Sequence, residues 1–479
     1  MPVSCLTVIV GVLPLGLLAA GAAPTDELTL FKLPEGMSGG QCCDGSPAAW
    51  YYGSPANESV SDWVIWLEGG GGCTTRQKCK HRNASTPQIM GSGGLKPIKA
   101  TGSKDFSKRA APSKYILSDD PALNPDFFHA HHVNIHYCSS DEFAGTRTEA
   151  SADTFGFYFS GHLHLVNIFD ELKKEYPKAF GSASRVLFGG SSAGGLGTFF
   201  NIDWARDQFP SSTVVKGAPL GGWFVPGDFP DQPHPYNPPS LWPDWASGKV
   251  TPWPVMPLNG SLDLYHRYVN PACAKALGPN AYTCQTVHAL YPYIQTPMYV
   301  MENNFDTNQL QSAFGFLDSN HSERAQEYVR YFGRGMRNST AQVCRKPDDG
   351  LFLSSCYDHT AGLGVGPATD FGTRINSKGS GTLLGEWFND RLPASDRILV
   401  DDCGELPCNP TCTNWPGSGP GPGPGPAPGP GCVAQLVKDG CDPEAGASKC
   451  AACARQHRSD LTKAGCDRET LTAYCEGTL

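Results

Sequence analysis

Short apolar runs alternate with longer amphipathic stretches through most of the chain. Two amphipathic stretches, 162–176 and 196–206, have apolar side chains at helical spacing and predict helices. The apolar runs are too short for helices and predict strands at 63–67, 133–135, 185–188, 214–215, 298–301 and 351–353. Strands that alternate with helices are typical of an α/β fold.

One segment departs from this alternation. Residues 223–257 contain four of the ten tryptophans together with many prolines. Proline cannot donate a backbone hydrogen bond, so this density of proline excludes a central strand or helix. We expect a long irregular segment, which is either an insertion held by its aromatic side chains or part of a lid or pocket wall.

The two ends of the chain differ from the part between them. Residues 8–20 form an uncharged apolar run followed by Ala20-Gly21-Ala22, which predicts a signal peptide over 1–22 and secretion. No later run approaches 18 apolar residues, so we expect no integral membrane segment. Residues 416–431 alternate proline with glycine and predict an extended linker between a large domain, 23–415, and a small module, 432–479.

Cysteines and glycosylation motifs agree with an oxidising, extracellular destination. Of 19 cysteines, Cys5 lies in the predicted leader, and the other 18 divide into twelve before the linker and six after it. Each part can therefore close its own disulfides, and the tail is expected to be a disulfide-rich module that, by analogy, binds a cell-wall or matrix polymer. N-x-S/T motifs occur at Asn57, Asn83, Asn259, Asn320 and Asn338.

Charge limits the classes of partner. Charged residues make up 17% of the chain, and the formal net charge is −9. This balance argues against nucleic acid or an anionic membrane as the main partner.

The central sequence GGSSAGG, residues 189–195, contains the strongest catalytic motif. Gly190 to Gly194 fits G-x-S-x-G with Ser192 at its centre, between a predicted strand and a predicted helix. In that context the motif forms a sharp turn that exposes a nucleophilic serine. The amide of Ala193, the next residue, is then expected to donate to an oxyanion.

A second glycine-rich stretch supports the same chemistry. Gly69 to Gly72 follow the predicted strand 63–67, where an oxyanion loop is expected in this class of hydrolase. Four glycines let backbone amides face a substrate without side chains in the way. A phosphate-binding loop is less favoured because no Gly-Lys-Ser/Thr follows.

A base and an orienting acid should follow the serine along the chain. His359, just after strand 351–353, is the best base among five later histidines, the others being His234, His266, His288 and His321. For the acid, Asp306 after strand 298–301 is favoured over Asp358, because consecutive residues orient one another poorly. A metal site at His129, His131, His132 and His136 is not favoured, since no HExxH motif occurs.

Several collinear blocks between about residues 28 and 412 resemble the pectin acetylesterase/Notum family. The blocks are QCCDGSPAAWYY, WLEGGGGC, YCSSDEFAG, GGSSAGGLG and GGWF. The resemblance implies secreted serine carboxylesterases with an α/β-hydrolase fold and no cofactor. It also implies Ser192 as nucleophile, Asp306 as acid, His359 as base, and oxyanion donors at Gly70, Gly71 and Ala193.

One position departs from the family pattern. Where relatives carry an aromatic residue after the first glycines of the oxyanion loop, this chain has Gly71 and Gly72. The pocket wall is therefore barer there, which leaves the preferred acyl chain open.

Together these features predict a secreted serine carboxylesterase that removes O-acetyl groups from a polysaccharide. An alternative is a Notum-like deacylase of lipidated proteins, and another is a catalytically silent binding protein on an esterase scaffold. A tethered tail module favours a polymer substrate, whereas an intact Ser, Asp and His set argues against a silent protein.

Overall fold

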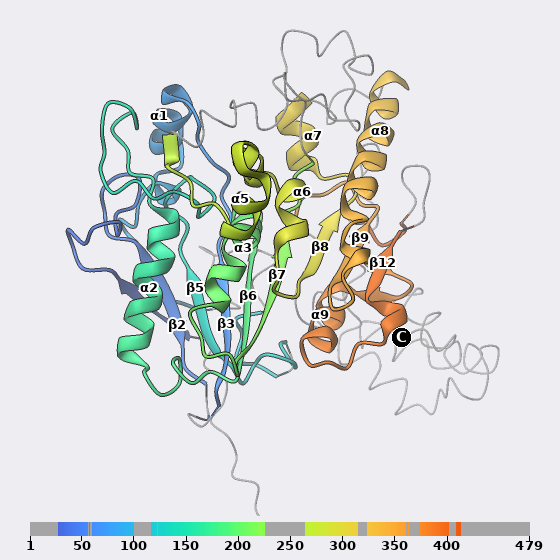
Figure 1. Cartoon of the computed structure of the whole chain (residues 1–479), viewed down its shortest axis with the longest axis horizontal. Helices are drawn as coiled ribbons and strands as arrows, with labels where there is room; N and C mark the ends of the chain where they lie inside the picture. The colour runs from blue at the N-terminus through green and yellow to red at the C-terminus, as the bar shows by residue number, and fades with distance from the viewer. Residues whose placement is uncertain are drawn as a thin grey trace, which may run out of the picture.

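A computed structural model describes residues 27–55, 57, 60–99, 116–121, 123–225, 264–314, 323–360, 363, 373–401 and 409–412 (Figure 1). The predicted leader, the Pro-Gly linker and the Cys-rich module lie outside the described residues. So does most of the proline-rich segment 223–257. The domain boundaries that depend on these segments therefore stay predictions.

A single ten-stranded sheet forms the centre of the molecule, in the order β12-β9-β8-β7-β6-β3-β5-β2-β1-β4. The seven strands from β12 to β5 are parallel, whereas β2, β1 and β4 are antiparallel. All six predicted strands are present, and the predicted α/β class is confirmed. The strands are β1 (Glu27–Lys32), β2 (Ala49–Gly53), β3 (Asp62–Leu67), β4 (Ile98–Lys99), β5 (His131–Ile135), β6 (Arg185–Ser191), β7 (Val214–Leu220), β8 (Tyr299–Asn303), β9 (Gly350–Ser354) and β12 (Ile398–Val400).

Helices surround this sheet, and both predicted helices are among them as α2 and α3 (Figure 1). The described α-helices are α1 (Arg76–Ser85), α2 (Gly161–Glu175), α3 (Ala193–Arg206), α5 (Pro271–Leu277), α6 (Val287–Leu290), α7 (Thr307–Phe314), α8 (Glu323–Thr340) and α9 (Ser380–Phe388). Short 3-10 turns lie at Pro87–Ile89, Gly278–Gln285, Tyr291–Tyr293, Val343–Arg345 and Ala394–Asp396, and β10 (Arg374–Ile375) pairs with β11 (Lys378–Gly379). No described helix combines the length and apolar character needed to cross a bilayer.

Two apolar layers cover the two faces of the sheet. Successive side chains of a strand point to opposite faces, so Trp63 and Ile65 of β3 join the buried residues of α2 and α3. Val64 and Trp66 instead pack with the apolar side of α9. Because both faces are covered, the central strands are apolar at nearly every position, which is why they appear in the sequence as continuous apolar runs.

The strand order changes direction at β3. After β5 on one side of β3, the chain crosses through α2 to β6 on the other side, where Leu67 of β3 pairs with Gly190 of β6. A reversal of this kind opens a crevice at the carboxyl ends of the strands, where ligands bind in open α/β sheets. The glycine loop after β3 and the serine turn after β6 therefore lie side by side at this crevice.

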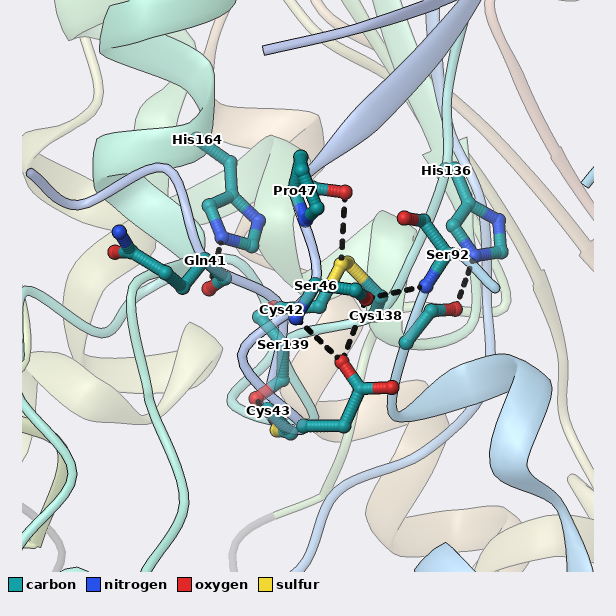
Figure 2. The surroundings of a disulfide bond; sticks show 12 residues. Gln41, Cys42, Cys43, Ser46, Pro47, Ser92, His136, Cys138, Ser139 and His164 are labelled. Atoms are coloured by element: carbon teal, nitrogen blue, oxygen red, sulfur yellow. Dashed lines mark hydrogen bonds between the residues drawn. A yellow bond between two sulfur atoms is a disulfide. The ribbon is translucent and has the colours of Figure 1, made fainter. Parts of the chain in front are cut away.

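Four disulfides lie among the described residues, at Cys42–Cys138, Cys73–Cys79, Cys273–Cys284 and Cys356–Cys412. Figure 2 shows the first of them, which spans 96 residues and ties the segment before β2 to the segment after β5. Cys43 and Cys344 are unpaired, Cys43 being buried and Cys344 exposed. The large domain therefore closes disulfides of its own, as expected, and Cys43 and Cys344 take no part in them.

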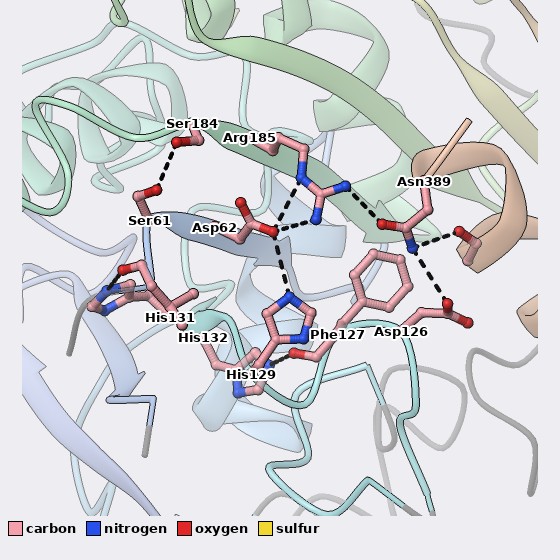
Figure 3. Close-up of polar contacts among 12 residues, drawn as sticks. Ser61, Asp62, Asp126, Phe127, His129, His131, His132, Ser184, Arg185 and Asn389 are labelled. Carbon is pink, nitrogen blue, oxygen red and sulfur yellow. Dashed lines mark hydrogen bonds and ion pairs between the residues drawn. The ribbon is translucent and has the colours of Figure 1, made fainter. Parts of the chain in front are cut away.

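A polar network lies at the opposite end of the sheet, at the amino ends of its central strands (Figure 3). Arg185 at the start of β6 donates from Nε to Asp62 at the start of β3, 3.1 Å away, and from Nη1 to Asn389, 2.7 Å away. Burial raises the pKa of Asp62, but hydrogen bonds from His129 and Arg185 outweigh it, and the pKa is lowered. The network links β3 and β6 to the segment after α9.

The junction between β6 and α3 requires glycine. A Cβ atom added at Gly194 would lie 2.1 Å from the carbonyl oxygen of Leu67, and one at Gly190 would lie 2.5 Å from the carbonyl oxygen of Gly194. Both contacts are with backbone, which cannot move aside as a flexible side chain can. The first turn of α3 therefore touches the end of β3 directly.

Replacing Gly194 with alanine should separate α3 from β3 and lower the free energy of unfolding by about 1–3 kcal/mol, as overpacking does. Urea denaturation of the purified protein measures the change. Gly93→Ala is the matched control, because Gly93 is exposed and a Cβ there meets nothing within 4 Å. Equal stability of the two variants would contradict the steric argument.

Candidate active site

Ser192 occupies a strained turn between β6 and α3. Its φ of 57° and ψ of −118° lie in a region that non-glycine residues rarely adopt. Its amide donates to the carbonyl of Leu220 in β7, 2.8 Å away, which fixes the turn against the neighbouring strand. The side chain is half-buried. This geometry matches the strand-turn-helix context expected for the G-x-S-x-G motif.

The structure brings Ser192, His359 and Asp306 together from three parallel strands. His359 Nε2 lies 2.8 Å from Ser192 Oγ, and His359 Nδ1 lies 2.7 Å from Asp306 Oδ2. Asp306 stands between β8 and α7, and its other oxygen accepts from the amide of Gln309, 2.9 Å away. His359 lies in the loop after β9. The three residues meet because parallel strands end at one edge of the sheet.

Two other candidates, Asp358 and His288, have different partners. Asp358 Oδ1 accepts from the backbone amide of His359, 2.6 Å away, and leaves the imidazole to Asp306. His288 lies beside Ser339, with 3.0 Å from Nδ1 to Oγ. His234 and His321 lie outside the described residues.

Two opposed effects act on the pKa of His359. Burial lowers this pKa, but the charge of Asp306 and its hydrogen bond raise it more, with a smaller contribution from Asp358. The net result is a pKa above the ordinary value. The Asp306 carboxylate therefore stabilises the imidazolium form, which a base needs after it accepts a proton.

The glycine loop after β3 lies against the serine turn. A Cβ at Gly69 would come within 2.7 Å of the carbonyl oxygen of Ser191, and Gly71 has a φ of +67°. The amides of Gly70, Gly71 and Ala193 donate no hydrogen bond to any other described residue. Ala193 is the first residue of α3, where a backbone N–H has no partner within the helix. One of these donors directly follows Ser192, and the other two follow Gly69, where an added Cβ would lie 3.0 Å from Ser192 Cβ.

Side chains from outside the loop hold its backbone, and the sequence analysis did not identify them. Arg82 Nη2 donates to the carbonyl oxygen of Gly70 at 2.6 Å, and the Tyr137 hydroxyl donates to that of Gly71 at 2.6 Å. Tyr137 lies in a family block, but Arg82 stands in the polar helix α1, where nothing in the local pattern distinguishes it from its neighbours.

Glu68 anchors the start of the loop. Its carboxylate accepts from His136 Nδ1 at 2.8 Å and from Asn134 Nδ2 at 2.7 Å. Burial raises the pKa of Glu68, but the adjacent His136 and the hydrogen bonds outweigh burial and lower it. The ionised carboxylate joins the ends of β3 and β5.

The acidic pair Asp141 and Glu142 has structural partners. Asp141 accepts from the amides of Gly161 at 2.8 Å and Phe143 at 3.1 Å, and burial raises its pKa to about 6. Glu142 forms a buried ion pair with Arg267. These contacts shape the loop after β5, in which Glu142 and Phe143 adopt positive φ.

A further carboxyl group lies next to Asp306, and nothing in the sequence pattern indicated it. Glu302 at the end of β8 is fully buried and accepts from the amides of Trp223 at 2.8 Å and Asn303 at 3.0 Å. Burial, followed by the charge of Asp306, raises the pKa of Glu302 well above the ordinary value. The raised pKa favours the neutral form of Glu302, which adds no second negative charge beside Asp306.

The histidines considered as metal ligands instead contact protein groups (Figure 3). His131 lies 2.8 Å from the Tyr52 hydroxyl through Nδ1 and 3.1 Å from the carbonyl oxygen of Val60 through Nε2. His132 Nε2 lies 2.9 Å from the carbonyl oxygen of Phe127. Within the part of the chain that the structure describes, no three His, Cys, Asp or Glu side chains are grouped to hold a metal ion.

Comparisons with known proteins agree with this geometry. A model of the pectinacetylesterase family matches residues 23–413. Pectin acetylesterase 5 of Arabidopsis thaliana is 25% identical over 400 residues, covering 78% of this chain and 82% of the relative. Palmitoleoyl-protein carboxylesterase notum1' of Xenopus laevis is 26% identical over 412 residues, covering 81% of this chain and 74% of the relative.

The fold also has a solved counterpart. The crystal structure of the Wnt deacylase Notum from Drosophila matches with a TM-score of 0.62 at 25% identity, covering 81% of this chain and all of that chain. This likeness is consistent with an α/β-hydrolase-like fold for the mixed sheet. With the family model matched over most of its length, the chain belongs to the pectinacetylesterase family and is a carboxylic ester hydrolase.

Proposed function

We propose that the protein is a secreted serine carboxylesterase in which Ser192 is the nucleophile, His359 the base and Asp306 the orienting acid. The observation that carries this proposal is the continuous chain of contacts from Ser192 Oγ to His359 Nε2 at 2.8 Å and from His359 Nδ1 to Asp306 Oδ2 at 2.7 Å. Gly70, Gly71 and Ala193 are the proposed oxyanion donors, because their amides donate to no other described residue and they directly follow Gly69 and Ser192, which pack against one another.

The proposed reaction has two steps. His359 accepts the proton of Ser192 as Oγ attacks the ester carbonyl, and the oxyanion donors stabilise the tetrahedral intermediate. The imidazolium then protonates the leaving alcohol, and an acyl-enzyme remains. Water, deprotonated by His359, attacks the acyl-enzyme, releases the acid and restores Ser192. No step requires a cofactor.

For the substrate we propose an O-acetylated polysaccharide. Several relatives at 25–26% identity are pectin acetylesterases by name. The predicted module at 432–479 and its Pro-Gly tether suit an enzyme that works on a polymer, and we propose that this module binds a cell-wall or matrix polymer. The predicted leader over 1–22 directs the chain out of the cell in this proposal. Asn83 and Asn338, two of the glycosylation motifs, are exposed.

A second candidate is a deacylase of lipidated protein. It is favoured by the likeness to the Wnt deacylase Notum, whose solved chain is matched over its full length. The two candidates share one mechanism and differ in the acyl group, so the acyl chain separates them.

A fluorophosphonate probe tests the nucleophile. The wild-type protein should be labelled, because His359 activates Ser192, and Ser192→Ala should not be labelled. Ser191→Ala is the matched control, since its side chain is buried one residue before the turn, and it should label like the wild type. Absence of labelling in folded wild-type protein would reject the esterase proposal.

The pH profile tests the acid. Wild-type kcat/KM should rise with pH through the elevated pKa of His359, because only the neutral imidazole accepts a proton. Asp306→Asn should lower kcat by roughly 10⁴-fold and move this rise to lower pH, because the carboxylate that raises the pKa is gone. Asp358→Asn is the comparison, and a larger loss in it than in Asp306→Asn would contradict the assignment.

A series of p-nitrophenyl esters from acetyl to palmitoyl tests the acyl group. We expect kcat/KM to be highest for acetate, because an acetylesterase gains nothing from additional methylenes. A deacylase would gain up to about 0.8 kcal/mol for each buried CH₂. A maximum at eight carbons or longer would overturn the acetylesterase choice in favour of the second candidate.

A further inference from the structure

We propose that Arg82 is a positioning residue of the oxyanion hole. Its guanidinium fixes the carbonyl of Gly70, and this orients the amide of Gly71 toward the oxyanion. The inference rests on the proposed function, since it assigns Arg82 to the same reaction.

The geometry of one peptide unit links the two groups. A trans peptide is planar, and its C=O and N–H point in opposite directions. Arg82 Nη2 binds the carbonyl oxygen of Gly70 at 2.6 Å, so the N–H of Gly71 in the same peptide unit points away from Arg82. That N–H donates to no other described residue.

The backbone conformation of the glycine loop, residues 69–72, depends on contacts with other parts of the chain. Four consecutive glycines impose few backbone preferences of their own, so contacts from outside must select one orientation for each peptide. The Tyr137 hydroxyl fixes the next carbonyl, that of Gly71, at 2.6 Å, and itself accepts from the amide of Glu142 at 2.9 Å. Arg82 Nη2 also reaches the carbonyl oxygen of Gly71, but at 3.5 Å, so its short contact is with Gly70 and that of Tyr137 is with Gly71.

Arg82 is held in turn by helix α1 and its disulfide. Cys79 and Arg82 are three residues apart and share a face of α1. Cys79 is bonded to Cys73 at the end of the glycine loop, so the bridge fixes the face that carries Arg82 toward the loop. Ser140 Oγ accepts from Arg82 Nε at 3.3 Å and from Nη2 at 3.2 Å, which sets the plane of the guanidinium.

The charge of Arg82 adds to its positioning effect. Among the described residues, no carboxylate lies within ion-pair distance of Arg82, although the guanidinium is half-buried. A cation at the carbonyl end of a peptide polarises the unit and makes its N–H a stronger donor. The Gly71 amide is therefore expected to bind a negative oxyanion better than an unsupported glycine amide would.

This role predicts a specific kinetic signature. The oxyanion exists in the tetrahedral intermediate and not in the bound ester, so loss of Arg82 should lower kcat with little change in KM. Removal of one oxyanion donor costs roughly 10²–10³ in kcat. Because Arg82→Ala leaves the donor present but poorly oriented, we expect a loss of about 10- to 100-fold.

The test compares Arg82→Ala, Arg82→Lys and Lys80→Ala in the full-length protein. Lys80→Ala removes a charge from the exposed side of the same helix and should behave as the wild type. For each we would measure kcat and KM on p-nitrophenyl acetate, the inhibition constant of a trifluoromethyl ketone that mimics the tetrahedral adduct, and Tm. In Arg82→Ala the inhibition constant should rise by about the factor by which kcat falls, and millimolar guanidinium should restore part of kcat.

The outcomes distinguish this inference from the proposed function. Wild-type kcat and inhibition constant in folded Arg82→Ala, or a rise confined to KM, would overturn the role of Arg82 while the esterase proposal stands. An inactive, unlabelled wild type would reject the esterase proposal itself. Should Arg82→Ala fail to fold, Arg82→Lys decides, because one ammonium cannot match the fork to Gly70 and Ser140. Wild-type kcat and inhibition in Arg82→Lys would overturn the inference.

Discussion

The close approach of three backbone segments is the constraint on which the site depends. The end of β3, the turn after β6 and the first turn of α3 lie so near one another that Gly69 and Gly194 have no room for a Cβ atom. This contact places the free amides of the glycine loop beside the serine turn. It also holds Ser192 in a backbone conformation that an isolated strand-turn-helix would not keep. Packing therefore maintains the strain at Ser192.

The charge that faces His359 Nδ1 depends on the burial of two carboxyl groups. Asp306 and Glu302 are both fully buried near one another, and two ionised carboxylates there would repel in a medium of low dielectric. Asp306 accepts the hydrogen bond from His359, while burial and the neighbouring Asp306 raise the pKa of Glu302 and favour its neutral form. A single negative charge thus faces the imidazole. Main-chain amides of Trp223 and Asn303 hold Glu302 in place.

Local sequence patterns sufficed for the centre of the fold and for the residues proposed to react. Buried parallel strands are apolar on both faces, and the serine turn has its own glycine spacing, so both are visible locally. Strand β1, which lies between β2 and β4, and helix α1 were missed. Helix α1 has one buried residue, Cys79, and so lacks an apolar period. Arg82 and Glu302 were missed for a related reason. Their importance comes from partners distant in sequence, such as Gly70 and Trp223.

The unpaired Cys43 has a consequence for the redox behaviour of the protein. It follows Cys42 directly and lies buried, with its thiol donating to the carbonyl oxygen of Ser139 at 2.9 Å (Figure 2). Exchange with a disulfide requires a thiolate, and burial raises the pKa of Cys43 well above the ordinary value. The native fold therefore favours the protonated thiol of Cys43, which does not attack the neighbouring Cys42–Cys138 bridge. Exchange with this bridge then requires local unfolding that exposes Cys43 to water, and the frequency of that unfolding limits the rate of exchange.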